Sequence, residues 1–218
     1  YKFYVFLNLF APKEKHLAAI KKLKEQGKSL LFIYAAGLIT ETDFSIKSMC
    51  DLIGINLKEF DYKDQIEFKG IVFPGKYNSS AQEIVFGFTR PIKPLFFVED
   101  PSAQGIGFYK KSGKTALAIK KVQNRFDAWS GLGCVPASVL RELAREAGVF
   151  IYSDANDPIY INKNILGYYC HEGGKRMIKT PSDCVLHELY TDEIFQTVDK
   201  QVEISFKADE MKLFKFEK

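Results

Sequence analysis

The strongest constraint on the fold is an uninterrupted apolar run, Leu30–Tyr34, inside the segment SLLFIYAAGLIT at 29–40. The run follows a helix-like segment and Gly27, and it has the length of one strand. A strand that is apolar on both faces belongs at the centre of a sheet whose two faces are both covered. The run therefore predicts a central strand at 29–36 in a parallel sheet with helices packed on it.

The residues at the carboxyl end of this strand indicate whether the sheet could carry a catalytic site. Ligands and catalytic groups of open α/β sheets gather just beyond the carboxyl ends of the strands. An enzyme could place its nucleophile on a tight turn there. This chain places Ala35, Ala36 and Gly37 at that point, two methyl groups and a glycine, which predicts a chemically empty strand end.

Helical periodicity appears in three places. Leu17, Ile20 and Leu23 form one apolar stripe, and glycines follow each periodic segment. The apolar segment at 2–10, the first helix and the strand at 29–36 follow one another as strand, helix and strand. This order predicts a parallel pair of strands with a right-handed crossover. The expected helices span about 13–26, 43–53 and 136–147.

Shorter signals fill the rest of the chain. Between residues 55 and 132, short apolar runs alternate with turn residues, and Lys110–Gly113 reads as a hairpin turn. After Gly148 the helical periodicity ends, and the last ~65 residues read as closely spaced strands. We therefore expect an α/β domain at 1–150 and a small antiparallel β-sandwich at 151–218.

Composition excludes several function classes. The 31 basic and 27 acidic residues are scattered along the chain and give a net charge of only +4, so we expect no nucleic-acid partner. No apolar run reaches the ~20 residues of a membrane span, so we expect no membrane partner. Gly131–Gly133 is too short for a dinucleotide fingerprint, so we expect no cofactor.

The four cysteines lack a metal-ligand spacing with the three histidines, so we expect no metal site. Cys170 and Cys184 could face one another on neighbouring strands, but buried free thiols are the favoured interpretation.

Cys134 is a candidate nucleophile because it lies between an expected strand and an expected helix. Val135 and Pro136 follow it, whereas a strained nucleophile turn needs small neighbours, so a buried thiol is the favoured interpretation. The other polar candidates are interpreted as solvated turns, strand residues or helix surface: His16, Glu99, Asp100, Asp154, Asn156, Asp157, His171 and His187.

A resemblance adds to these observations. The segment YVFLNLFAPKEKHLAAIKKLKEQGKSLLFIYAAGLI at 4–39 resembles the pattern LFxxxE, helix, KxxGKxLLxxYxxG. That pattern occurs in the glutamine amidotransferase-like, or trimerisation, domain of bacterial beta-galactosidases. Further segments resemble the remainder of that domain and the β-sandwich after it: FFVED, SGKTALAIKK, WSGLG, LRELAREAGVFIYSD, NDPIYIN and GGKRMIKTPSDCVLHELYTDE.

The resemblance implies a flavodoxin-like sheet, of the class I glutamine amidotransferase type, with helices on both faces. It places Ala35 where active amidotransferases have their cysteine, and a methyl group cannot attack a carbonyl. It also implies that the first βα unit of the domain lies upstream of Tyr1, and that a catalytic barrel with its two carboxylates lies outside this chain. Whether the parent protein is cytoplasmic or exported stays open.

The function expected from the resemblance is structural. The chain would be a non-catalytic part of a beta-galactosidase-like glycoside hydrolase. It would assemble as a homo-oligomer (dimer or trimer), and the catalytic domain of the parent protein would bind the carbohydrate. Two alternatives from other classes stay open. One is a hydrolase or amidotransferase-like enzyme using Cys134 with His171 or another base. The other is a carbohydrate-binding module with an aromatic platform drawn from Trp129, Tyr168, Tyr169 or Tyr190.

Overall fold

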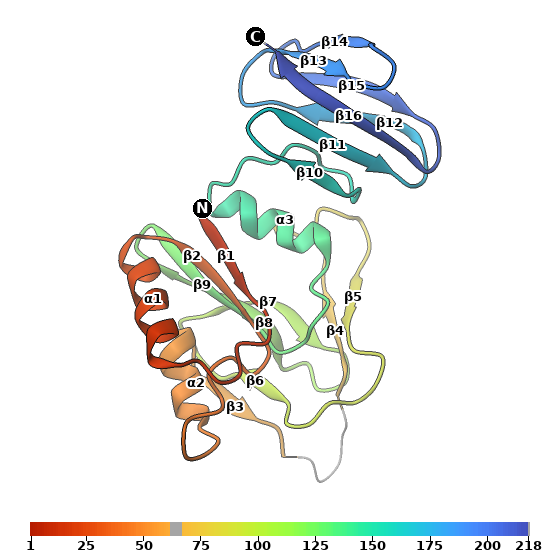
Figure 1. Cartoon of the computed structure of the whole chain (residues 1–218). Helices are drawn as coiled ribbons and strands as arrows, with labels where there is room; N and C mark the ends of the chain where they lie inside the picture. Colours follow the sequence, from red (N-terminus) through yellow and green to blue (C-terminus); the bar gives the residue numbers. More distant parts are fainter. Residues whose placement is uncertain (62–66, 218) are drawn as a thin grey trace. The chain divides into compact units, whose positions relative to one another are not determined.

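The structure, a computed structural model, describes residues 1–61 and 67–217 (Figure 1). The chain divides into two compact units, Tyr1–Val149 and Phe150–Lys218, called unit 1 and unit 2 below. Each unit has its own hydrophobic core, and each is described by itself.

A seven-stranded mixed sheet forms the body of unit 1. From one edge to the other its strands are β1 (Phe3–Phe6), β2 (Ser29–Ile33), β9 (Arg125–Ser130), β8 (Thr115–Val122), β7 (Gln104–Tyr109), β4 (Lys69–Val72) and β5 (Ile84–Gly87). The pairs β1–β2 and β2–β9 are parallel, and the four remaining pairs are antiparallel.

Three helices occur among the described residues: α1 (Glu14–Glu25), α2 (Ile46–Ile53) and α3 (Ala137–Glu146). α2 shows why they begin and end where they do. The Ser45 hydroxyl accepts a hydrogen bond from the Ser48 N–H at its start, and Gly54 takes the left-handed conformation at its end.

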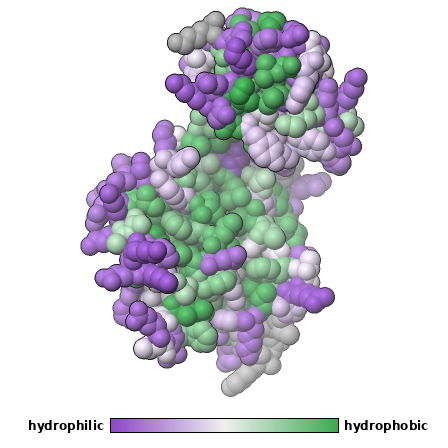
Figure 2. Space-filling model, in the orientation of Figure 1, coloured by the Kyte–Doolittle hydropathy of each residue, from purple (hydrophilic) through white to green (hydrophobic). Residues whose placement is uncertain are grey.

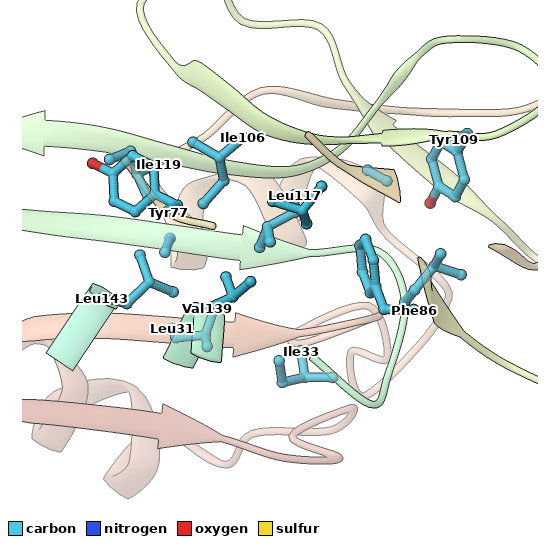
Figure 3. Close-up of a cluster of buried hydrophobic side chains, with 14 of the residues drawn as sticks. Leu31, Ile33, Tyr77, Phe86, Ile106, Tyr109, Leu117, Ile119, Val139 and Leu143 are labelled. Atoms are coloured by element: carbon cyan, nitrogen blue, oxygen red, sulfur yellow. The ribbon is translucent and has the colours of Figure 1, made fainter. Parts of the chain in front are cut away.

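The core of unit 1 lies on both sides of β2, and all five residues of this strand are buried. Leu31 and Ile33 pack in one cluster, and Leu30 and Phe32 pack in the other. Figure 3 shows the first cluster, in which Val139 of α3 lies close to Leu31. The helix residues buried in the two clusters are Val139 and Leu143 in the first, and Ile20, Met49 and Ile53 in the second.

The predicted flavodoxin-like α/β fold is wrong. Strand makes up 40% of the structure and helix 14%, and the sheet is mixed and curled rather than a doubly wound parallel sheet with helices on both faces. The reason is connection length, because a parallel pair needs a crossover of about a dozen residues whereas an antiparallel pair needs a short turn. Only residues 110–114 join β7 to β8, and only Gln123 and Asn124 join β8 to β9.

A small second ladder lies beside this sheet. β3 (Leu57–Glu59) pairs antiparallel with β6 (Phe96–Val98), and Glu59 is the direct partner of Phe96. This ladder carries Glu59 and Phe96, which both border a hollow of unit 1.

Unit 2 consists of antiparallel strands. A five-stranded sheet has the order β10 (Ile159–Ile161), β11 (Ile165–Cys170), β16 (Glu210–Glu217), β13 (Val185–Glu188) and β14 (Ile194–Gln196), and a separate pair is formed by β12 (Gly174–Lys179) and β15 (Gln201–Phe206). Both sheets contribute to one core, through residues such as Leu166, Phe214 and Ile204. Residues 149–153 form no strand, although the sequence predicts closely spaced strands after Gly148.

Candidate functional site

The carboxyl ends of the three parallel strands meet at one edge of unit 1, where Figure 1 shows β1, β2 and β9 side by side. Three non-glycine residues with left-handed backbone follow these strands: Asn8 (φ 54°), Tyr34 (φ 59°) and Cys134 (φ 58°). Left-handed backbone is uncommon for residues other than glycine, and for a bulky residue such as Tyr34 it is a genuine outlier. Such outliers gather at functional positions, so this edge is the candidate functional site.

Tyr34 is held in its strained conformation from three directions. Its N–H donates to the Ser130 carbonyl at 2.6 Å, and its own carbonyl accepts from Trp129 Nε1 at 2.8 Å. Its hydroxyl donates to the Pro94 carbonyl at 2.6 Å. These bonds tie the end of β2 to β9 and to the segment before β6, and together they fix the direction of the Tyr34 ring.

Two hollows open at this edge and share Phe10 and Tyr34 as common walls. The first, called the Phe44 hollow, has a volume of about 520 Å³ and is mainly apolar. Its described walls are Phe10, Tyr34, Ala35, Leu38, Ile39, Phe44, Ile46, Glu59, Lys93, Pro94 and Phe96.

The second, called the Cys134 hollow, is also about 520 Å³ in volume. Its described walls are Val5, Leu7, Asn8, Phe10, Ile33, Tyr34, Phe88, Ile92, Gly133, Cys134, Val135 and Leu140. Cys134 is exposed here rather than buried. Because these walls include no histidine, carboxylate or lysine, they offer no base that could activate the thiol.

Ala35, at the position expected for a lost nucleophile, is buried and contributes a methyl group to the wall of the Phe44 hollow. The left-handed residue after β2 is its neighbour Tyr34. Burial, together with the negative charge of Glu59, raises the pKa of the Tyr34 phenol. The phenol therefore stays neutral near pH 7, so neither residue supplies a nucleophile or a base to this edge.

The remaining acidic candidates are occupied by structural partners. Asp100 accepts from the Asn56 N–H at 3.1 Å and from Lys120 Nζ at 3.0 Å, and these bonds, with those from Ser102, hold its pKa well below the usual range despite its burial. Asp157 accepts from Arg176 Nε at 2.5 Å and from the Tyr168 hydroxyl at 2.9 Å. Glu99 lies 3.5 Å from Lys58 Nζ, and Asp154 lies 2.5 Å from Lys179 Nζ.

Each histidine has a local partner as well. His16 Nδ1 accepts from the Lys13 N–H at 3.1 Å, which places it in the first turn of α1. In unit 2, His171 Nδ1 lies 2.5 Å from Asp209 Oδ1 and His187 Nε2 lies 3.1 Å from Asp192 Oδ1. The hydrogen bond to Asp209 raises the pKa of His171.

Of the four aromatic residues considered for a sugar platform, Trp129 and Tyr168 are fully buried. The Tyr169 hydroxyl donates to Asp209 at 2.7 Å, and Tyr190 is 70% exposed. Trp129 and Tyr168 therefore act in the two cores and offer no exposed face to a ligand.

Within residues 1–61 and 67–217, no cluster of three or more histidine, cysteine or acidic side chains is arranged to hold a metal ion. All four cysteines are free thiols, Cys170 buried and Cys184 partly buried. In the same described residues, no helix combines the length and the hydropathy that a membrane crossing requires.

Comparison with known proteins gives matches at the level of structure alone. No protein-family model matches the sequence, and no curated protein sequence matches it significantly. The structure is similar to the beta-galactosidase of Bacillus circulans sp. alkalophilus, with a TM-score of 0.63, 13% identity, 99% of this chain covered and 33% of that one. It is also similar to Gan42B, a GH42 beta-galactosidase from G. stearothermophilus, with a TM-score of 0.61, 12% identity, 100% of this chain covered and 32% of that one.

The chain shares the fold of one part of these beta-galactosidases. It spans about a third of their length. A similar match, with a TM-score of 0.55 and 9% identity, is found to an alpha-L-fucosidase isoenzyme from Paenibacillus thiaminolyticus, covering 100% of this chain and 41% of that one. The shared part therefore occurs in enzymes named for different sugars, and the fold itself does not specify one.

The apolar run that ends at Tyr34 predicts this edge from the sequence, but most residues that line its hollows have no signal in the sequence. Phe10, Phe44, Glu59 and Phe96 come from four separate segments, and no spacing in the chain connects them. The signal that was available is Tyr34 itself, a bulky residue at a strand end before two alanines and a glycine.

Proposed function

We propose that this chain is a non-catalytic part of a larger glycoside hydrolase, and that it holds copies of that protein together as a homo-oligomer. One observation carries the proposal: nearly the whole chain matches a third of the length of GH42 beta-galactosidases in fold. Because the chain matches only a third of such an enzyme, we infer that it is one part of a similar enzyme and that the rest of the parent protein performs the carbohydrate chemistry.

The candidate site supports a non-catalytic role. Glycoside hydrolysis ordinarily needs two carboxyl groups on either side of one bond. The described walls of the Phe44 and Cys134 hollows include one carboxylate, that of Glu59. The turn after β2 carries Tyr34 and Ala35 and so lacks a nucleophile for acyl transfer.

The surface of unit 1 supports an assembly role. Figure 2 shows hydrophobic residues gathered over the middle of unit 1, with hydrophilic residues around them. Large exposed apolar side chains in this unit include Leu7 (68%) and Val85 (50%). Monomeric proteins rarely expose extended apolar surface, because water disfavours it, whereas subunit interfaces bury such surface.

Two assays test the two halves of the proposal. Purified chain is incubated with nitrophenyl β-galactosides and with glutamine, and we expect hydrolysis of neither. Sedimentation velocity then compares Leu7→Lys with Val198→Lys, which changes an equally exposed valine (67%) in unit 2. We expect the Leu7 variant to dissociate and the Val198 variant to sediment like the unaltered chain.

Hydrolysis that disappears in Cys134→Ala would instead favour the enzyme hypothesis. Circular dichroism spectra of both lysine variants must match that of the unaltered chain, so that dissociation reports on the surface and not on unfolding.

A further inference from the structure

The Phe44 hollow has the composition of an aromatic cage. Four rings border it, from Phe10 after β1, Tyr34 after β2, Phe44 before α2 and Phe96 in β6. The Phe10 and Tyr34 rings are 6.0 Å apart at 88°, and the Tyr34 and Phe96 rings are 6.3 Å apart at 50°. Phe10 and Phe96 therefore both contact the Tyr34 ring, so three of the four rings are held together where the hollow opens.

A carboxylate stands at the same hollow. Glu59 is the direct cross-strand partner of Phe96, so both side chains project from the same face of the β3–β6 ladder. The negative charge of Glu59 also raises the pKa of Tyr34, which places the carboxylate within electrostatic range of that ring. Within residues 1–61 and 67–217, no hydrogen bond or ion pair of the Glu59 side chain is found.

We propose that the Phe44 hollow binds a quaternary ammonium group, held by the aromatic rings of Phe10, Tyr34 and Phe44 and by the charge of Glu59. The negative face of an aromatic ring attracts a cation, and rings around a methylated ammonium are a known way of recognising it. Glu59 is an acceptor, but the rings of Phe10, Phe44 and Phe96 offer none, so a primary ammonium could direct only part of its N–H groups to a partner there, whereas a quaternary ammonium has no N–H to satisfy.

The strained backbone of Tyr34 fits this role. Its hydroxyl already donates to Pro94, and its main chain is bonded to Ser130 and Trp129. The ring is therefore fixed before any ligand arrives, so little side-chain freedom is lost on binding. The volume of about 520 Å³ leaves room for the body of a ligand beyond the ammonium group.

Replacing Lys93 tests whether the bound ligand is positively or negatively charged. Its side chain also borders the Phe44 hollow. A positive charge there opposes a cationic ligand, so removing it should strengthen the binding of a cation and weaken the binding of an anion.

Isothermal titration calorimetry of the whole chain tests the proposal with choline, tetramethylammonium and dimethylbutanol, the neutral carbon isostere of choline. We expect choline and tetramethylammonium to bind with a Kd on the order of 1 mM. Dimethylbutanol has the same shape without the charge, and we expect it to bind roughly tenfold more weakly.

Variants locate the binding. We expect Phe44→Ala and Glu59→Gln each to weaken choline binding roughly fivefold, Phe44→Trp to strengthen it, and Lys93→Met to strengthen it. Phe73→Ala and Glu83→Gln are matched controls on exposed side chains of unit 1 outside the hollow, and they should leave the Kd unchanged. Phe44 is 72% exposed, so its replacement does not threaten the fold.

Three results would overturn the proposal: no heat from choline or tetramethylammonium up to about 20 mM, equal binding of choline and dimethylbutanol, or equal losses in the Phe44 and Phe73 variants. None of these results depends on the oligomeric state or on the absence of hydrolysis, so the cage and the proposed function fail separately.

Discussion

The indole Nε1 of Trp129 donates a 2.8 Å hydrogen bond to the backbone carbonyl of Tyr34, joining β9 to the strained turn after β2. Trp129 is fully buried and Tyr34 has a φ of 59°. One side chain of the core thus helps to hold the turn that separates the two hollows. The shape of the candidate site depends on this bond.

Replacing Trp129 with Phe should reduce the free energy of unfolding by about 3 kcal/mol, because a buried carbonyl loses its donor and a cavity remains. Urea unfolding followed by circular dichroism measures the loss. Since the chain has one tryptophan, substituting benzothienylalanine for it removes the N–H at this position alone and keeps the shape. The isostere should cost about 1 kcal/mol, and no loss would show that the bond does not stabilise the turn.

Stability should fall in acid through Glu146. Burial alone would raise the pKa of Glu146, but hydrogen bonds from Lys76, Tyr77 and Lys121 outweigh it and lower the pKa to about 2. A carboxyl whose pKa is lower in the folded state stabilises the fold above its ordinary pKa of 4.5. That stabilisation is lost as the pH falls from 4.5 toward 2.

Glu146→Gln should therefore be less stable than the unaltered chain by about 2 kcal/mol at pH 7, with the difference shrinking below pH 4.5. Urea midpoints from pH 7 to pH 2.5 give this difference directly. Glu25→Gln, on the exposed face of α1, is the control and should show little difference at any pH. A Glu146 difference that stays constant with pH would contradict the assigned charge interactions.

The two units should unfold separately. Phe214 is fully buried in the core of unit 2, so Phe214→Ala should destabilise that unit by about 4 kcal/mol. Trp129, the sole tryptophan, lies in unit 1, so its fluorescence reports on unit 1 alone. We expect the fluorescence midpoint to stay unchanged while circular dichroism shows an earlier transition, and a common shift of both signals would mean one cooperative domain.

Some elements of the fold were accessible from local patterns. The run Leu30–Tyr34 marked a buried strand, and apolar spacing with glycine stops marked the helices now seen at Glu14–Glu25, Ile46–Ile53 and Ala137–Glu146. Each of these patterns is formed by residues that lie close together in the sequence, so it can be recognised from the sequence of one protein.

Strand direction was mistaken because one strand–helix–strand unit was extended to the whole sheet. The hairpin turn at Lys110–Gly113 joins β7 to β8 as an antiparallel pair, which a sheet of parallel strands alone does not contain. The walls of the Phe44 hollow were inaccessible for another reason. Phe10, Phe44 and Glu59 meet only through tertiary packing, and no local pattern encodes that meeting.

The molar mass of the chain in solution tests the central proposal most directly. Light scattering on the purified chain should give two or three times the 24.9 kDa of one chain at micromolar concentrations and above. Such a mass would support an assembly role for the exposed apolar surface of unit 1. A mass of 24.9 kDa at every concentration would contradict it.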